Sequence, residues 1–227
     1  MARLHDLRRR GGRASWTLAA TLVALAPVPT TPAAAQSEPA VWRLDGSEPV
    51  TYFIADGPPG SGFRESDRTL AEWALRAWGR QVEPALELAA GPEASATIRV
   101  YWVGGSSGLY GEMRARTVGG KPAAEVFIHP DTEGLGPDIA TKGRLDPLFR
   151  DTVVYLTCVH ELGHAFGLSH TDAFADIMYS FQFGGDFVAY FTRFREQLES
   201  RDDIEGTSPF SAGDIGAFRV LYAAGSG

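Results

Sequence analysis

The chain has 227 residues, of which 44% are hydrophobic, and its formal net charge at pH 7 is −7. An acidic surface repels nucleic acids and anionic membranes, so we expect neither as a partner. The one cysteine, Cys158, excludes an internal disulfide. We expect its side chain to be buried as a small apolar group, because free cysteine is among the most buried residue types.

Residues 1–35 have the order of a signal peptide. Arginines gather before an apolar run over residues 16–26, and three consecutive alanines then end at Ala35, just before Gln36. A membrane anchor is the alternative, but this apolar run is much shorter than the roughly 20 residues that span a bilayer. We therefore predict cleavage near Ala35 and a secreted chain, either periplasmic or extracellular.

The mature chain, residues 36–227, is long enough for one domain and too short for two. With five arginines and Asp6 removed, 16 basic and 27 acidic residues remain, and the formal charge becomes −11. We expect a single domain that is monomeric and has no stable membrane insertion.

The first half of the mature chain contains short strands and one amphipathic helix. Apolar residues at spacings of three and four predict a helix from Ser66 to Val82, with Ser66 as its N-cap. Short apolar or alternating segments between glycine-rich turns predict five strands. They cover residues 50–54, 86–88, 97–102, 110–117 and 124–128.

A second metal site is conceivable just after the last predicted strand. There the sequence His129-Pro-Asp131-Thr-Glu133 offers an imidazole and two carboxylates. No further ligand follows at a suitable spacing, so we favour a solvated loop.

Three histidines and a glutamate lie in one stretch, His160-Glu161-Leu-Gly-His164-Ala-Phe-Gly167-Leu-Ser-His170. Residues four apart lie above one another on a helix, here predicted over residues 151–165, so His160 and His164 can bind one metal ion. His170 can reach the same ion only if the chain turns sharply, and Gly167 can adopt the positive φ of such a turn. The motif therefore predicts a three-histidine zinc site.

Three protein ligands leave the fourth tetrahedral position of zinc for water, which is the arrangement of catalytic sites. Glu161 adjoins the first ligand, His160, and therefore lies beside the metal. A carboxylate in that place can take a proton from the water and pass it to a leaving amine. The sequence thus predicts a hydrolase with Glu161 as general base.

The motif, followed by Met178, resembles that of the metzincin clan of zinc peptidases. Thr171 after the third histidine, Tyr179 after the methionine and the segment 211–222 make the chain most similar to the matrixin (matrix-metalloprotease-like) family. The resemblance implies an α+β, zincin-like metzincin fold. Its parts would be a twisted five-stranded mixed sheet, two long helices, a methionine turn and a C-terminal helix. In this clan the methionine, here Met178, lies beneath the metal as a hydrophobic base.

The resemblance also implies how a substrate would bind. Metzincins hold a peptide as an extended strand along their fourth strand, here residues 110–117, with a specificity pocket beside the zinc. The resemblance allows calcium as a further metal, although no motif of the sequence identifies a calcium site. Many animal matrixins are kept latent by a propeptide cysteine, and we expect no such latency because no cysteine precedes residues 50–54.

The segment between the methionine and the last predicted helix, residues 181–210, is longer than the resemblance leads us to expect. Its aromatic residues recur at helical spacing after Asp186, which predicts an extra helix over residues 187–199 with Asp186 as N-cap. Metzincins build the outer wall of the specificity pocket here, so Phe183 and Phe187 are candidates for that wall. The alternative is that the aromatic stripe only covers the core.

Two kinds of function fit these residues. The first is a secreted zinc endopeptidase, or more narrowly a hydrolase of a non-peptide amide such as a cell-wall crosslink. The second is a binding module on the same fold with little activity, since fold alone does not fix function. Glu161 favours an enzyme, because a protein that only binds has no use for a base beside intact ligands.

Overall fold

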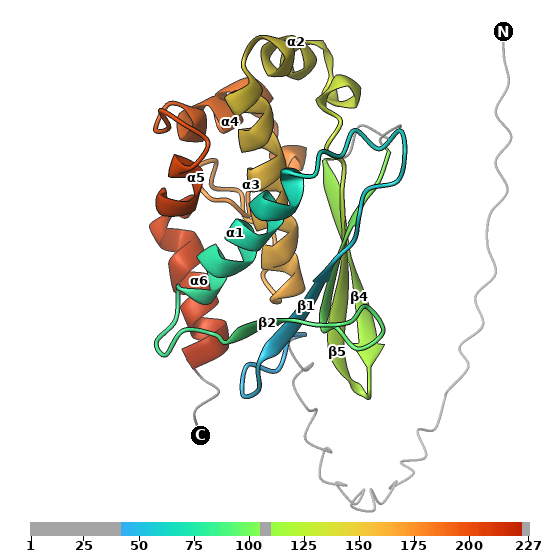
Figure 1. Cartoon of the computed structure of the whole chain (residues 1–227). Coiled ribbons are helices and arrows are strands. Elements are labelled where there is room, and N and C mark those ends of the chain that lie inside the picture. Colours follow the sequence, from blue (N-terminus) through green and yellow to red (C-terminus); the bar gives the residue numbers. More distant parts are fainter. Residues whose placement is uncertain (1–41, 105–109, 224–227) are drawn as a thin grey trace, which may run out of the picture. The chain divides into compact units, whose positions relative to one another are not determined.

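The computed structural model describes residues 42–104 and 110–223. Its strands form one mixed sheet in the order β2-β1-β3-β5-β4, in which β4 alone runs antiparallel to its neighbour. The helices lie on one face of this sheet (Figure 1), which confirms the predicted α+β fold. The strands are β1 (Val50–Ile54), β2 (Leu88–Ala90), β3 (Ile98–Trp102), β4 (Gly111–Val118) and β5 (Lys121–Ile128).

Two long helices, α1 and α3, pack against each other and against the sheet. The indole nitrogen of Trp78 on α1 donates a hydrogen bond of 2.8 Å to the carbonyl oxygen of Val159 on α3. The α-helices are α1 (Asp67–Gly79), α2 (Pro137–Leu145), α3 (Pro147–Ala165), α4 (Phe187–Arg195), α5 (Asp203–Gly206) and α6 (Ala212–Ala223). Short 3-10 helices, η1 (Thr132–Leu135) and η2 (Phe181–Phe183), precede α2 and α4.

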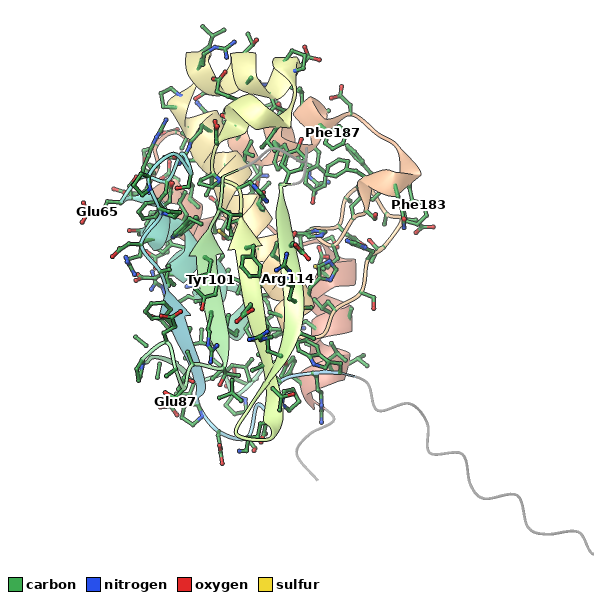
Figure 2. All side chains as sticks on the ribbon, turned by 90° about the vertical axis from the view of Figure 1, so that its right-hand side faces the viewer. Glu65, Glu87, Tyr101, Arg114, Phe183 and Phe187 are labelled. Carbon is green, nitrogen blue, oxygen red and sulfur yellow. The ribbon has the colours of Figure 1, made fainter. Side chains whose placement is uncertain are left out.

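The alternation of side chains along the central strands separates the core from the outer face of the sheet. On β3, Ile98, Val100 and Trp102 are buried toward the helices. Tyr101 points to the opposite face, which Figure 2 shows together with Arg114 of β4. Successive residues of a strand point to opposite faces, so one buried face is enough to fix the register.

Strand β4 lies at the edge of the sheet beside the helices that carry the candidate site. It pairs with β5 through a two-residue turn, Gly119-Gly120, in which both residues have positive φ angles of 57° and 82°. This is the turn type that suits the twist of a hairpin. Since β5 is its one strand partner among the described residues, β4 keeps its other backbone edge available for an extended peptide.

Helix α3 begins earlier than its apolar periodicity predicts, at Pro147 rather than Asp151. The Asp146 side chain accepts hydrogen bonds from the backbone N–H groups of Leu148 and Phe149, each at 3.1 Å. Proline in the first helical position loses no bond, because its missing N–H would have no partner inside the helix. The capped start fixes the helix whose far end carries the histidines.

Helix α1 and strand β2 differ from the predicted bounds. The helix ends at Gly79 instead of Val82, because the Gly79 carbonyl accepts a hydrogen bond from Leu86 and the chain folds back there. Strand β2 covers residues 88–90 instead of 86–88, in register with β1. Its short apolar sequence does not determine which three residues pair.

Ser66 stands at the start of α1 as predicted, but its side chain makes no capping hydrogen bond. The next residue, Asp67, is fully buried, accepts a hydrogen bond from the Arg64 amide and pairs with the guanidinium group of Arg150 on α3. A buried carboxylate requires such a partner. This ion pair ties the start of α1 to the helix of the candidate site.

Other sequence predictions have mixed outcomes. Helix α4 begins at Phe187 as predicted, and the Asp186 side chain accepts a hydrogen bond from the Ala189 amide at 3.0 Å, but the helix ends at Arg195 instead of residue 199. Cys158 is buried, as expected. The predicted signal peptide, residues 1–35, lies outside the described residues. Among the helices that the structure describes, none has the length and apolar character needed to cross a membrane.

Candidate metal centre

The three histidines of the motif converge on one point. The Nε2 atom of His170 lies 3.2 Å from Nε2 of His160 and 3.0 Å from Nε2 of His164. Two ligand atoms that share a tetrahedral zinc ion at about 2.0–2.1 Å would be roughly 3.3 Å apart. Within the described part of the chain, this is the one group of three histidine, cysteine or acidic side chains close enough to hold a metal.

Backbone carbonyl groups fix which nitrogen of two of these rings carries the hydrogen. Nδ1 of His160 bonds the Ile177 carbonyl at 2.7 Å, and Nδ1 of His164 bonds the Leu168 carbonyl at 2.8 Å. A carbonyl oxygen only accepts, so each Nδ1 must donate and each Nε2 must carry a lone pair. Carbonyl acceptors of this kind orient metal-binding imidazoles in many proteins.

The site fits a divalent metal because a single hydrogen on Nε2 of His170 could satisfy at most one of the two lone pairs that His160 and His164 direct at it. Burial lowers the pKa of all three histidines, that of His160 to about 3, so the rings are neutral at neutral pH. Two imidazole lone pairs that face each other at the distance between these Nε2 atoms repel each other unless a hydrogen or a cation lies between them. The histidine triad therefore fits a zinc site.

The turn that returns His170 to the site depends on Gly167, as predicted. This residue has a φ of 104°, which side chains other than glycine rarely tolerate. A Cβ atom there would lie 2.5 Å from the carbonyl oxygen of Trp42. Helix α3 therefore ends where the motif requires it to end.

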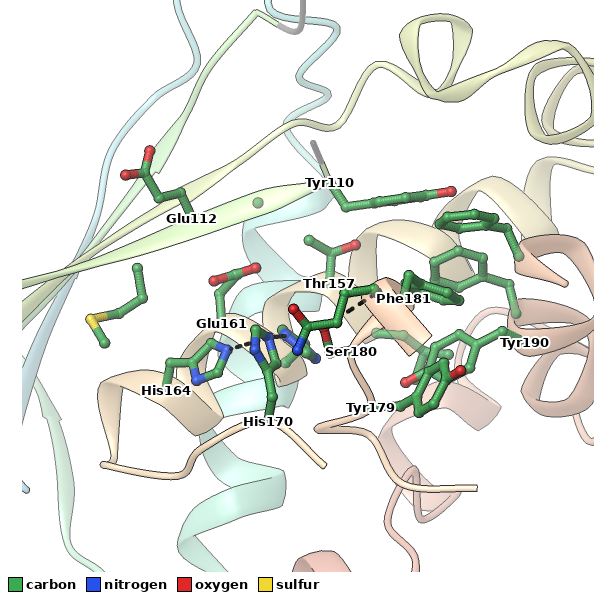
Figure 3. Close-up of a pocket in the computed structure, with 17 residues that line it drawn as sticks. Tyr110, Glu112, Thr157, Glu161, His164, His170, Tyr179, Ser180, Phe181 and Tyr190 are labelled. Atoms are coloured by element: carbon green, nitrogen blue, oxygen red, sulfur yellow. Dashed lines mark hydrogen bonds between the residues drawn. The ribbon is translucent and has the colours of Figure 1, made fainter. Parts of the chain in front are cut away.

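Glu161 is 7% exposed and lies between the histidines and strand β4 (Figure 3). The pKa of Glu161 is raised to about 8, mainly by burial and also by the Glu112 carboxylate, while a hydrogen bond from the Met113 backbone opposes this rise. A cation held by the histidines would lower it as well. The close approach to β4 requires Gly111, because a Cβ atom there would lie 2.6 Å from Cγ of Glu161.

Met178 packs beneath the helix that carries the ligands. It is 2% exposed, and its Sδ atom would lie 2.4 Å from a Cβ atom added to Gly163. The chain from Thr171 to Ser180 closes the turn, with hydrogen bonds from the Thr171 amide to the Met178 carbonyl and from the Ser180 amide to the Thr171 carbonyl. Met178 is therefore buried against the helix that carries His160 and His164, and its position beneath a bound metal stays a prediction.

The carboxylate of Asp214, at the start of α6, is a part of the site that the sequence analysis missed. It accepts hydrogen bonds from the backbone amides of Ile177 at 2.8 Å and Met178 at 3.2 Å. It also forms a reciprocal capping pair with Ser211, whose hydroxyl accepts from the Asp214 amide. The Ser-x-x-Asp spacing signals the cap, but the bonds to the methionine segment span more than thirty residues and leave no local pattern.

Substitution of Gly163 tests the packing of Met178 against helix α3. We expect Gly163→Ala to lower the free energy of unfolding by about 1–3 kcal/mol, the usual cost of overpacking a core. Gly206→Ala is the matched control, because no atom lies within 4 Å of its Cβ position. Urea unfolding of both variants measures the difference, and equal stability of the two would show that Met178 does not press on the helix.

A cavity of about 620 Å³ opens beside the histidines. Glu161, Gly111 and Met113 line one end of it, so it adjoins the edge of β4. Aromatic rings from three parts of the chain surround the other end (Figure 3). These are Tyr110, Phe181, Phe187, Tyr190 and Phe191.

The segment 181–210 therefore reaches the cavity, but the two residues singled out from the sequence behave differently. The Phe187 ring lines the cavity, stacked 4.1 Å from Phe181 and 5.7 Å from Tyr110 between ring centroids. Phe183 does not line it and is 57% exposed. Helical spacing cannot reveal this, because Phe183 lies in η2, outside the predicted helix.

The residues around His129 do not form a second metal site. The Asp131 side chain instead caps η1 by accepting a hydrogen bond from the Glu133 amide, and Glu133 pairs with Arg144. Glu133 is exposed, as expected for a solvated loop, whereas Pro130 and Thr132 are buried. Burial lowers the pKa of His129.

Comparison with protein families agrees with this architecture, although no individual curated protein sequence matches the chain significantly. The family model described as matrixin matches residues 42–206. This range begins before β1, includes the histidine motif, η2 and α4, and ends with α5. Because this match covers well over half of its length, the chain belongs to the matrixin family of zinc metalloproteases.

Proposed function

We propose that the mature chain is a secreted zinc endopeptidase in which His160, His164 and His170 hold the metal and Glu161 is the general base. The observation that carries the proposal is the convergence of three neutral imidazoles at the mouth of a cavity, with a buried carboxylate beside them. Zinc bound there would supply a Lewis acid for the scissile carbonyl and lower the pKa of a water molecule.

Other residues of the site would bind the peptide and transfer the proton. The free edge of β4 can align an extended peptide by backbone hydrogen bonds, and the cavity can take the side chain next to the cut bond. Glu161 lies between that edge and the histidines, where it can accept a proton from water and donate it to the leaving amine. Burial raises its pKa, which makes it a stronger base than a surface glutamate.

Cleavage of a mixed peptide library tests the proposal. The purified mature chain should cut internal peptide bonds, and a chelator should abolish the cutting, as read from product masses. A protein that binds zinc and peptides without cutting them would instead be a binding module. Cutting of cell-wall crosslinks alone would indicate a non-peptide amide as the substrate.

Export is part of the proposal and rests on the order of residues 1–35. We expect the exported protein to begin at Gln36, directly after the three alanines. N-terminal sequencing of material from outside the cytoplasm measures this. Retention of the segment before residue 33 would favour an uncleaved membrane tether.

The aromatic end of the cavity should select the side chain just past the cut bond. Phe187→Ala removes a ring from its wall, so larger side chains should be accepted and kcat/KM for the best wild-type substrate should fall on the order of 10-fold. Val220→Ala is the control, because Val220 is 73% exposed on α6 and does not line the cavity. An unchanged cleavage profile with lower thermal stability would mean that Phe187 only covers the core.

A further inference from the structure

The Ile177 carbonyl oxygen, which accepts the hydrogen bond from Nδ1 of His160, has a second donor. The hydroxyl oxygen of Tyr190 lies 3.1 Å from this carbonyl oxygen and 3.1 Å from that of Asp176, and it donates to both. A carbonyl oxygen has two lone pairs, so the bonds from His160 and Tyr190 together use the acceptor capacity of the Ile177 carbonyl. Tyr190 therefore contacts the group that orients a candidate metal ligand.

Tyr190 reaches this carbonyl from α4, the helix in the segment that is longer than the resemblance to matrixins leads us to expect. Its ring is buried and stacks 6.3 Å from that of Tyr179 between centroids, as Figure 3 shows. Arg193 lies three residues later, on the same face of the helix, and donates to the Asp176 carbonyl at 3.3 Å. Two side chains of α4 thus hold the chain just before the methionine.

The peptide group between Ile177 and Met178 is held on both of its sides. Its N–H group donates to the Asp214 carboxylate at 3.2 Å, and its C=O group accepts from Tyr190. Because a peptide group is planar, bonds on its two opposite sides fix the direction in which the carbonyl oxygen points. Tyr190 and Asp214 are 3% and 2% exposed, so bulk water does not compete for these bonds.

We propose that Tyr190 is a positioning residue of the metal site, which acts on His160 through the Ile177 carbonyl. The partner of a metal-binding imidazole fixes the orientation and tautomer of the ring, and its loss typically weakens metal binding roughly 10- to 100-fold. Without the Tyr190 hydroxyl, the peptide group is held on one side only and can rotate away from the direction that His160 requires. The inference rests on the proposed zinc site, and it gives the long segment a role in metal binding.

Tyr190→Phe tests the inference, because it removes the hydroxyl group and keeps the ring that packs beside the cavity. The dissociation constant for zinc, measured by competition with a chelator, should rise on the order of 10-fold. This is the lower end of the usual range, since Tyr190 lies one bond farther from the metal than the carbonyl does.

Tyr222→Phe is the matched control. The Tyr222 hydroxyl also donates to a backbone carbonyl, that of Phe166 at 2.9 Å, but no histidine of the described residues bonds this carbonyl. The control should keep the wild-type dissociation constant for zinc. Urea unfolding of the metal-free proteins should show that both variants are folded and lose similar stability, because each loses one hydrogen bond of the same kind.

Cobalt in place of zinc gives a readout of geometry, because its visible absorption depends on the arrangement of the ligands. The spectrum should change in Tyr190→Phe and stay that of the wild type in Tyr222→Phe. An unchanged zinc dissociation constant or cobalt spectrum in Tyr190→Phe would overturn the inference, and so would equal weakening of zinc binding in both variants. A wild-type protein that binds no zinc would instead overturn the proposed metal site.

Discussion

Replacing Glu161 with glutamine should leave zinc in the protein and reduce peptide turnover at least 10²-fold, the usual contribution of a general base. Glutamine has the shape of the buried glutamate, so it should fit between β4 and the histidines, but its amide cannot accept a proton. Metal analysis and steady-state kinetics on the same preparation measure the two effects separately.

Glu112→Gln is the informative comparison for this variant, because Glu112 also lines the cavity. Its carboxylate is far more exposed, and the side chain of Arg114 lowers its pKa, so it is a weaker base than Glu161. We expect a much smaller loss of turnover than in Glu161→Gln. A larger loss in Glu112→Gln would move the general base from the helix to the strand.

Replacing His170 with alanine should remove most of the zinc and all measurable peptidase activity. His170 is the most exposed of the three histidines and lies outside α3, so its loss should disturb folding least. Two histidines bind zinc much more weakly than three, because metal sites of this class use three protein ligands. Circular dichroism should be unchanged in the far ultraviolet while the zinc content falls.

His129→Ala provides the control for the histidine variants. His129 lies in the loop after β5 and belongs to no group of metal-binding side chains in the described residues. This variant should keep one zinc ion per chain. Full activity in His170→Ala, or loss of zinc in His129→Ala, would contradict the three-histidine site.

The central strands and the histidine helix could be predicted because the residues that determine them lie close together in the sequence. Alternating buried residues determine β3 and β5, and the histidine spacing requires a helix that ends before Gly167. The site depends on these strands and on this helix, and each is encoded in a short stretch of sequence. For this reason the predicted ligands lie together in the structure.

Other features differ from what the apolar pattern predicts, and of these the role of Asp214 depends on contacts between distant residues. Helix α2 has no clear signal in the sequence, because its nine residues include Gly143 and show little apolar periodicity. Apolar periodicity alone predicts a start of α3 at Asp151, whereas Asp146 and Pro147 carry the signals of the capped start that the structure shows. The role of Asp214 beneath the methionine segment becomes visible only once α6 is packed against it.

The most direct test of the account is reconstitution with zinc. Protein stripped by a chelator should cut no peptide, and cutting should return in proportion to added zinc until one equivalent per chain is bound. Glu161→Gln should bind the same equivalent and remain inactive. Full cutting by the stripped protein, or one bound zinc per chain without any cutting by the wild type, would contradict the account.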